Sequence, residues 1–352
     1  MGATLHDVAR DAGVSLATAS RVLNGSARRV ADSYRERVEA AARKLGYTAN
    51  LSAQATARGT SAIIALLVAD IADPYFGQIA AGVARGADEA GLVVTIAISE
   101  RDAQREAALV RALRGQRPRG LILAASRTVA PDPPSPSAAS DPTAVPGAPA
   151  LARELETFAS LGGRIVAIGR GAPKLRSVAI DNFGGARNLG LALAGRGYRR
   201  AVVLAAAMGV LSSDDRVAGF AAGFAEGGGK AVEVHRGGFT REAGWQAMNE
   251  ALTMGVDPGT VVFGVSDVVA IGAMSALREA GRRVGDDVAV CGFDDIPTSR
   301  DVTPALSTVR IPLEEVGYRA LRAIIDDDWN ADATGIRLEV LLRDSTPPVS
   351  GR

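Results

Sequence analysis

From Ser61 onward the chain alternates short apolar runs with longer helical stretches, and this alternation constrains the fold more tightly than any other feature. The run AIIALLVAD has the continuous apolar character of a buried strand, and PYFGQIAAGVARGADEAG after it has helical spacing. The next run, LVVTIAI, is again typical of a strand, and the cycle repeats as far as DVAVCGF. Strands that alternate with helices in this way predict parallel sheets with helices on both faces. So many units favour two doubly wound subdomains over one sheet, in a chain whose 352 residues can bury more than one core.

The N-terminal segment has a different, all-helical pattern. Leu5, Val8 and Ala9 recur at i, i+3 and i+4, which places one apolar stripe on a first short helix. Gly13 permits the tight backbone reversal of a helix-turn-helix. Ser15 is a suitable N-cap for a second helix. The segment therefore predicts two short helices joined by a sharp turn.

The second helix presents two contrasting faces. Ala19, Val22 and Leu23 are placed to pack against the first helix. The opposite face carries short side chains and one long cation, namely Leu16, Ala17, Thr18, Ser20 and Arg21. Such a surface can enter a major groove without steric conflict, which favours DNA recognition. A small three-helix domain without this function would show the same turn and periodicity, so this pattern alone leaves both interpretations open.

A third helix and a polar linker complete the N-terminal part. The helix is predicted from Asp32 to Leu45, with Gly46 ending it. Residues 47–60 are small and polar, as is typical of a linker. Residues 1–60 carry nine Lys or Arg against five Asp or Glu, a net charge of +4, whereas the rest of the chain stands at −3. A basic head on a faintly acidic body favours a polyanion-binding module joined to a part that does not touch DNA.

Two segments of the head, VSLATASRVLNG and VADSYRERVEAAARKLGYTAN, resemble the DNA-binding domain of the lac repressor family of bacterial transcription factors nearly position for position. The resemblance extends over essentially the whole chain. It implies an all-α helix-turn-helix head, followed by two doubly wound parallel-sheet subdomains similar to periplasmic sugar-binding proteins. A ligand cleft is expected between these two subdomains.

The resemblance also implies domain boundaries. The helix-turn-helix domain is expected at residues 1–46 and the hinge at 47–60. The two sensor subdomains are expected at residues 61–170 plus 296–329 and at 171–295 plus 330–349. Crossovers between them would fall near Gly169–Pro173, Asp294–Pro297 and Asp326–Ala331. Residues 130–149 hold seven prolines, which predicts a disordered surface insertion.

In that family the two residues after the VS dipeptide, and an arginine a few positions later, face the bases. These are Leu16, Ala17 and Arg21 here. Arg21 is expected to supply most of the hydrogen-bonded readout of guanine, about 1–3 kcal/mol, with a phosphate contact or a solvent-exposed position as the alternatives. The family's hinge has a leucine wedge in the minor groove where this chain has Thr56, so hinge binding with a smaller DNA bend is expected. The predicted DNA-binding set is Ser15, Leu16, Ala17, Thr18, Ser20, Arg21, Asn24, Asn50, Ala53 and Thr56.

Ligand clefts of doubly wound proteins form at the carboxyl ends of strands. By resemblance, aromatic rings would flank a ligand, hydroxyls and arginines would bind its polar groups, and an aspartate would accept bonds from its hydroxyls. Phe76 fits a core position equally well, and Asp294 fits a turn or a helix cap. Arg170 stands where several relatives have aspartate. The predicted effector-binding set is Tyr75, Phe76, Arg170, Ser212, Arg216, Phe239, Ser266 and Asp294.

These expectations define a transcriptional regulator, expected to be a repressor, that binds palindromic double-stranded DNA as a homodimer under control of a small-molecule effector. A sugar is the preferred effector, with a purine or another metabolite as the alternative. A solute-binding protein of a sugar uptake system is the other alternative, but such a protein needs a signal peptide, and none is expected from the N-terminal residues MGATLHDVAR.

No enzymatic activity, cofactor or metal is expected. Only His6 and His235 are available, and no phosphate-binding loop or nucleophile elbow occurs. Cys291 lies in an apolar run and is expected to be a buried small hydrophobe. The sequence has no run of 18 or more apolar residues, so a soluble cytoplasmic protein without a membrane partner is predicted.

Overall fold

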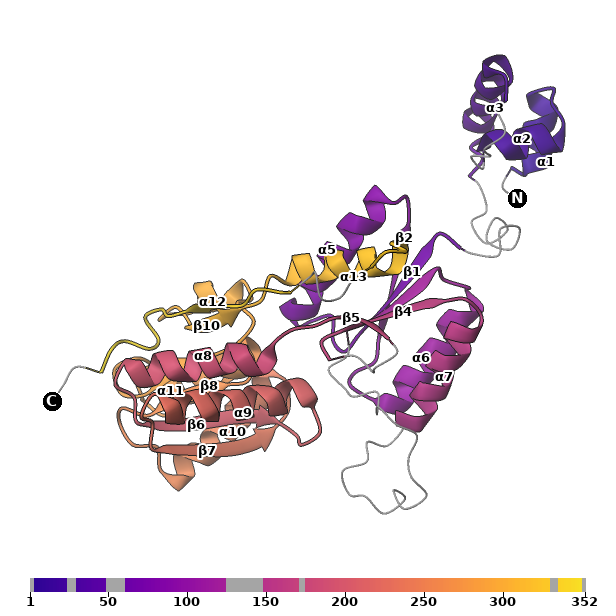
Figure 1. The fold of residues 1–352 in the computed structure, drawn as a ribbon. Coiled ribbons are helices and arrows are strands. Elements are labelled where there is room, and N and C mark those ends of the chain that lie inside the picture. The colour runs from indigo at the N-terminus through magenta and orange to yellow at the C-terminus, as the bar shows by residue number, and fades with distance from the viewer. Residues whose placement is uncertain are drawn as a thin grey trace. The chain divides into compact units, whose positions relative to one another are not determined.

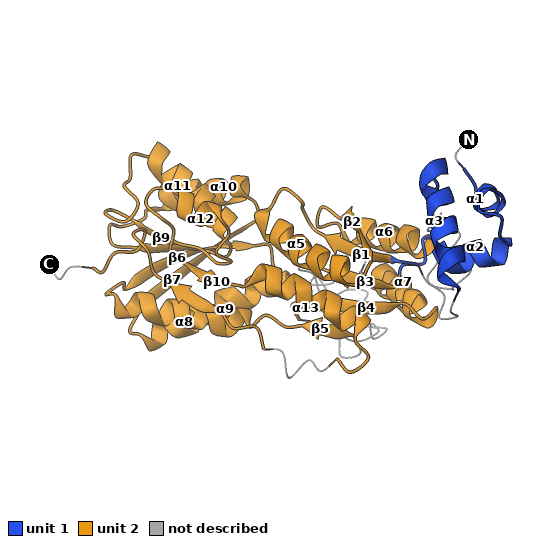
Figure 2. Cartoon of the chain, turned by 90° about the horizontal axis from the view of Figure 1, so that it is seen from above, with its two compact units in different colours: residues 1–62, 116–118 blue, residues 63–115, 119–352 orange. Residues whose placement is uncertain are grey.

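The structure is a computed structural model, which describes residues 3–23, 30–48, 61–124, 148–170, 175–329 and 335–349. The chain divides into two compact units (Figure 2). The first comprises Met1–Ala62 and Gln116–Pro118, and the second comprises Ile63–Gly115 and Arg119–Arg352.

The described residues of the first unit form three helices around a small core. They are α1 (Leu5–Asp11), α2 (Leu16–Leu23) and α3 (Asp32–Leu45). Gly13 has a φ of 61° in the turn, and the backbone N–H of Thr18 donates to Ser15 Oγ at 3.1 Å, so the predicted turn and N-cap are confirmed. Gly46 ends α3 with a φ of 59°. The core is made of small side chains, namely Val8, Ala9, Ala12, Ala19, Val38, Ala41 and Ala42.

The second unit begins with a parallel sheet in the order β2-β1-β3-β4-β5 (Figure 1). Its strands are β1 (Ile63–Val68), β2 (Val93–Ile98), β3 (Gly120–Leu123), β4 (Arg164–Ile168) and β5 (Arg176–Val178). Alternate residues of β1 point to opposite faces: Leu66 packs with α5 (Pro74–Glu89) and α13 (Leu313–Ile325), whereas Leu67 packs with α6 (Ala103–Gly115) and α7 (Ala148–Ser160). Helices therefore cover both faces, as predicted.

A second parallel sheet has the order β7-β6-β8-β9. Its strands are β6 (Arg200–Ala206), β7 (Ala231–Gly237), β8 (Val261–Gly264) and β9 (Ala289–Cys291). Val203 of β6 faces α8 (Asn182–Gly195) and α9 (Leu211–Glu226), and its neighbour Leu204 faces α10 (Arg241–Met254) and α11 (Asp267–Glu279). The predicted pair of doubly wound parallel sheets is confirmed. Cys291 is fully buried in β9, as expected.

Two expected crossover positions differ from the structure. β5 pairs with β4 in the first sheet, although residues from 171 onward were expected in the second subdomain. Beyond β9, the short helix α12 (Thr298–Asp301) and β10 (Thr308–Arg310) stay with the second sheet through bridges from Ser307 to Cys291 and from Arg310 to Asp294. The chain returns to the first sheet only at Leu313, because these extended residues pair along the edge of β9.

An antiparallel pair adds to the parallel sheets. β11 (Glu339–Leu341) runs antiparallel to β10, with Val340 opposite Val309. The C-terminal segment then continues along the second subdomain, where Ser345 accepts from the backbone N–H of Ser307. β11 thus joins the second sheet through β10 and is not part of a parallel ladder.

Helices α8 and α9, which carry much of the site described below, touch through their backbones. A Cβ on Gly219 would lie 2.2 Å from the carbonyl oxygen of Phe183, and a Cβ on Gly223 would lie 1.9 Å from that of Arg187. Glycine is required at these two positions because no side-chain movement could relieve a clash with backbone.

No helix in the described part of the chain has both the length and the apolar character needed to cross a membrane.

Several predictions fall outside the described residues. The expected proline-rich insertion lies in the undescribed part of the chain up to residue 147, and its last two residues belong to α7, which begins at Ala148. The hinge residues 49–60 are not described either.

Candidate functional site

A cavity of about 210 Å³ lies in the second unit, at the carboxyl ends of strands from both sheets. All eight residues of the predicted effector set line it, although they come from six separate segments of the chain. Asp73, Arg101, Asn182 and Asp215 line it as well. The fold thus brings the predicted set together in one place.

Arg216 and Asp294 form the buried centre of this cavity. The Arg216 Nη2 atom lies 3.0 Å from Asp294 Oδ1, and the two side chains are only 4% and 6% exposed. Arg216 also donates from Nε to Asn182 at 2.8 Å and from Nη1 to the carbonyl oxygen of Val265 at 2.7 Å. Its guanidinium lies 4.0 Å from the ring centre of Phe293. Contacts on so many sides fix the guanidinium plane before any ligand enters.

Burial changes the protonation of the cavity carboxylates. It raises the pKa of Asp294 to about 7, against the opposing charge of Arg216. The nearby charge of Asp73 adds to this rise. The pKa of Asp73 is itself raised by burial, although the backbone N–H of Tyr75 donates to its carboxylate at 3.0 Å. The charge of Asp294 therefore changes near neutral pH.

Two buried serine hydroxyls face the cavity without a hydrogen-bond partner. Ser212 Oγ lies at the start of α9, and Ser266 Oγ lies just before α11. Both residues line the cavity. Because buried polar groups are normally hydrogen-bonded, these two atoms are well suited to bind polar groups of a ligand.

The mouth of the cavity carries two arginines from the first subdomain. Arg170, which follows β4, donates through Nη2 to both carboxylate oxygens of Asp215 on α9, each at 2.9 Å. Arg101, which follows β2, lies 5.5 Å from the ring centre of Phe239 and 3.9 Å from Asp73. Both arginines therefore reach residues that lie across the cavity or beside it.

The aromatic residues occupy two different environments. Tyr75 and Phe76 meet edge to face, with ring centres 5.0 Å apart. Phe76 is only 2% exposed and belongs to the main core, so the core alternative holds for most of its surface. Phe239 is partly buried and packs at the edge of the same core. Tyr75 and Phe239 therefore offer more ring surface to a ligand than Phe76 does.

Sequence reasoning missed five polar lining residues, namely Asp73, Arg101, Asp181, Asn182 and Asp215, and two of them left a signal. Asp215 lies three residues after Ser212 on α9, so helical spacing places both on one face. Asp73 precedes Pro74 as the N-cap of α5. Arg101 adopts a left-handed φ of 63° in a loop, and nothing local in the sequence indicates that it points into the cavity.

The predicted DNA-reading face lies on α2 in the first unit. Ser15, Ala17 and Arg21 are exposed, and Leu16 is 39% exposed. Thr18 and Ser20 are partly buried. The hydroxyl of Ser15 is engaged with Thr18 at 2.8 Å, in keeping with its role as a cap. The remaining members of the predicted set, Asn24, Asn50, Ala53 and Thr56, lie outside the described residues.

Comparison with known proteins matches both parts of the chain. Residues 4–50 match the bacterial regulatory proteins of the lacI family, and residues 191–346 match a periplasmic binding protein-like domain. The transcriptional regulator GalS of Salmonella typhimurium is 34% identical over 88% of this chain and 85% of its own length. GalR of Escherichia coli is 32% identical over 97% of this chain and 94% of its own.

Solved structures of transcriptional regulators are also similar to this chain. A lac repressor dimer bound to operator and the anti-inducer ONPF is 25% identical with a TM-score of 0.78, covering 99% of this chain and all of that one. A complex of the transcriptional regulator CelR with cellobiose is 28% identical with a TM-score of 0.64, covering 97% of this chain and 99% of that one.

Proposed function

Because this chain belongs to the lacI family of bacterial regulatory proteins, we propose that it is a transcriptional repressor controlled by a sugar. The exposed face of α2 binds operator DNA, and the cavity in the second unit binds the effector. The protein is not an enzyme. The same proposal places it in the bacterial cytoplasm, acting on the DNA of the nucleoid.

DNA recognition is assigned to the predicted set on α2 and in the hinge. Arg21 reaches a guanine edge and supplies most of the hydrogen-bonded readout, while Leu16 and Ala17 contact apolar groups such as thymine methyls. Lys and Arg side chains of the head neutralise phosphates and supply most of the affinity. One such helix reads only a few base pairs, so a homodimer on a palindromic site is required.

Effector recognition is assigned to the cavity residues. A sugar presents hydroxyls on its edges and C–H groups on its faces. Asp294 and the fixed guanidinium of Arg216 suit the hydroxyls, as do the partnerless hydroxyls of Ser212 and Ser266. The ring of Tyr75 suits an apolar face of the sugar. CelR, one of the relatives, has been solved with cellobiose.

One observation carries this proposal: a single chain combines an exposed reading helix with a cavity in which all eight residues of the predicted effector set meet. A solute-binding protein would have no use for the first feature. A DNA-binding protein without an effector would have no use for a cavity with partnerless buried hydroxyls.

The proposal is tested by a thermal-shift screen of sugars and nucleobases on the full chain, followed by DNA binding with each hit. The DNA is obtained by selection from a library of random palindromes. We expect a sugar to raise the Tm and to change the affinity for the selected DNA. If a nucleobase raises the Tm instead, the effector is a heterocycle and not a sugar. If no compound raises the Tm, the effector assignment is overturned.

The DNA assignment has its own test. Arg21→Ala is expected to weaken binding of the selected operator by about 1–3 kcal/mol and to relax specificity at one base pair. Arg283→Ala, on an exposed turn after α11, is the matched loss of one positive charge and should leave operator affinity unchanged. Equal, sequence-independent weakening by both variants would show that Arg21 provides charge alone.

A further inference from the structure

The backbone that carries Asp294 is strained. Asp294 has a φ of 119° and Asp295 a φ of 56°, so two consecutive residues with side chains lie in the left-handed region. Such a conformation persists only where its surroundings hold it, and it is concentrated at ligand-binding sites. What holds this turn therefore decides where the Asp294 carboxylate points.

Backbone bonds hold part of the turn. The N–H of Asp294 donates to the carbonyl oxygen of Val309 at 2.8 Å, and the N–H of Ile296 donates to the buried carboxylate of Asp267 at 2.9 Å. The N–H of Asp295 donates to Thr308 Oγ1 at the longer distance of 3.3 Å. The carbonyl oxygen of Asp294 accepts from the N–H of Ile311, also at 3.3 Å. The flanks of the turn are thus held by short bonds, whereas the peptide between the two aspartates is held by two longer ones.

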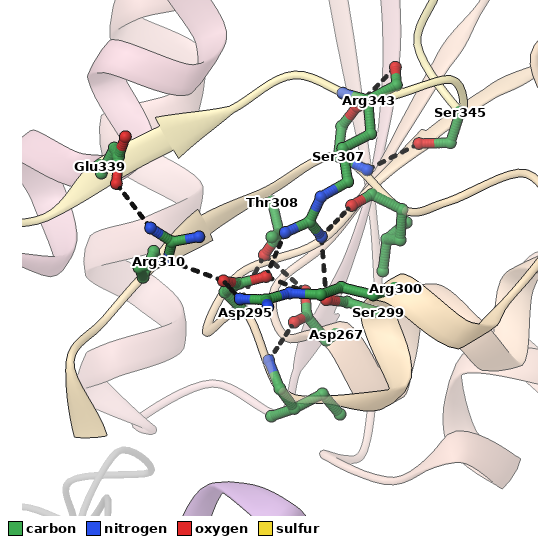
Figure 3. A network of polar contacts seen from close by, with 12 residues as sticks. Asp267, Asp295, Ser299, Arg300, Ser307, Thr308, Arg310, Glu339, Arg343 and Ser345 are labelled. Atoms are coloured by element: carbon green, nitrogen blue, oxygen red, sulfur yellow. Dashed lines mark hydrogen bonds and ion pairs between the residues drawn. The ribbon is translucent and has the colours of Figure 1, made fainter. Parts of the chain in front are cut away.

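The side chain of Asp295 supplies the missing restraint. It is only 1% exposed, and three arginines converge on it (Figure 3). Arg300 Nη2 donates at 3.0 Å and Arg310 Nε at 2.8 Å, both to Oδ2, while Arg343 Nη2 donates to Oδ1. Ser299 Oγ also donates to Oδ1, at 3.1 Å. Although burial opposes ionisation, these bonds keep the pKa of Asp295 below its usual value.

The three arginines come from separate elements. Arg300 lies on α12, and Arg310 ends β10, where it also binds Glu339 of β11 at 2.9 Å. Arg343 follows β11 and donates a further bond, at 2.7 Å, to the carbonyl oxygen of Leu306. One arginine would be enough to neutralise Asp295. Three from different directions fix the position of its carboxylate as well as its charge.

We propose that Asp295 is a positioning residue for the effector cavity: Arg300, Arg310 and Arg343 hold its carboxylate and thereby keep the strained turn in the conformation that aims Asp294 at Arg216. This rests on the proposed function, in which Asp294 binds the effector. We call the three arginines bound to the Asp295 carboxylate the clamp. When the clamp is removed, the turn relaxes, Asp294 moves away from Arg216, and the Asp294 carboxylate becomes hydrated.

The first test needs no ligand. In the full-length protein with ¹³C-labelled aspartate carboxyls, NMR titration should show the Asp294 pKa falling from about 7 toward its ordinary value in Asp295→Asn, because the carboxylate gains water. Asp294→Asn assigns the resonance. Asp295→Asn keeps the shape of the side chain but removes the charge that the arginines bind. A folded Asp295→Asn protein with an unchanged Asp294 titration would overturn the proposal.

If Asp295→Asn fails to fold, substitutions of the three arginines test the same shift of the Asp294 titration. Arg343→Lys should shift the Asp294 titration more than Arg300→Met, since the side chain of Arg343 is 18% exposed and that of Arg300 is 60% exposed. Arg283→Met, whose arginine binds carboxylates on a remote exposed turn, is the control and should change nothing. Identical titrations in all three variants would contradict the clamp.

Calorimetry with cellobiose, D-ribose and D-galactose then separates this proposal from the proposed function. For whichever sugar binds the wild type, Asp295→Asn should bind about tenfold more weakly, as expected for the loss of one hydrogen bond to a charged group. Equal affinity would overturn the positioning role. If no sugar binds the wild type while the Asp294 titration still shifts, the sugar assignment fails and the clamp stands.

Discussion

One wall of the cavity is formed by α8, α9 and the loops after β8 and β9, and its polar groups bind one another. The other wall is formed by α5 and the loops after β2 and β4, and its Arg170 binds across the cavity. Arg216 and Asp294 pair within the first of these walls, both almost fully buried. Arg170, from the second, pairs with Asp215 on the opposite side, and its side chain is 64% exposed. One wall is thus organised without a ligand, and the other depends on how closely the two subdomains approach.

This difference separates two tasks. The preorganised wall can select a ligand, because its donors and acceptors are held in place before binding. The opposite wall can respond to closure, because exposed ion pairs are weak and easily exchanged. In a repressor controlled by a ligand, both tasks are needed. Substitutions in the two walls should therefore differ in size and in kind.

The largest effect is expected at the centre of the preorganised wall. Arg216→Met should destabilise the protein by about 3–5 kcal/mol in urea unfolding, because Asp294 is left buried without its partner. The double variant Arg216→Met/Asp294→Leu should recover most of that loss without recovering the effector response. A single variant as stable as the wild type would show that this wall is not organised by the pair.

The next effect concerns the backbone beneath the same wall. Gly219→Ala should cost about 1–3 kcal/mol of unfolding free energy, since its Cβ would lie 2.2 Å from the carbonyl oxygen of Phe183. Gly77→Ala on α5, where no atom lies within 4 Å of the added Cβ, should instead stabilise by up to about 1 kcal/mol. Equal effects at both glycines, measured by urea unfolding, would contradict the difference between the walls.

The third prediction concerns pH. The pKa of Asp294 is about 7 in the folded state and near 3.8 when unfolded, so the folded protein holds the extra proton between these values. The stability that this group contributes is fully present below about pH 4 and is lost as pH rises through about 7. Asp294→Asn should therefore flatten the fall in unfolding free energy across this window.

A control with the opposite sign is available on an exposed turn. Hydrogen bonds from the backbone and side chain of Arg283 lower the pKa of Asp287, so its contribution is present at neutral pH and is lost as pH falls through the lowered value. Asp287→Asn should remove a loss of stability at acid pH and leave the slope near neutral pH intact. Parallel curves for wild type and Asp294→Asn would be evidence against the raised pKa.

The smallest effect is expected at the mouth. A double-mutant cycle with Arg170→Ala and Asp215→Ala should give a coupling of about 0.2–1 kcal/mol that declines with added salt, because Arg170 is largely exposed. The same substitutions should alter effector affinity by more than they alter stability if the pair reports closure. A coupling as large as that expected for Arg216 and Asp294 would make the two walls equivalent.

Much of the fold follows from local pattern. Apolar spacing and the glycine stop at Gly46 placed α3 at Asp32–Leu45, and the structure has the helix there. The crossovers were harder to place. β5 and β10 have only three residues each, and their position depends on which strand edge is available for pairing. That information is not local, so the boundaries taken from resemblance were displaced.

The sequence by itself determined that this chain has a helical N-terminal head and two doubly wound subdomains, because periodicity, caps and turns act over a few residues. Only the tertiary structure decided what two adjacent aspartates do. Asp294 faces the cavity with a pKa raised by burial, and Asp295 points away with a pKa lowered by its hydrogen bonds to arginines. Their partners, from Arg216 to Arg343, are brought to them by folding, and the environment of a charge depends on those distant neighbours.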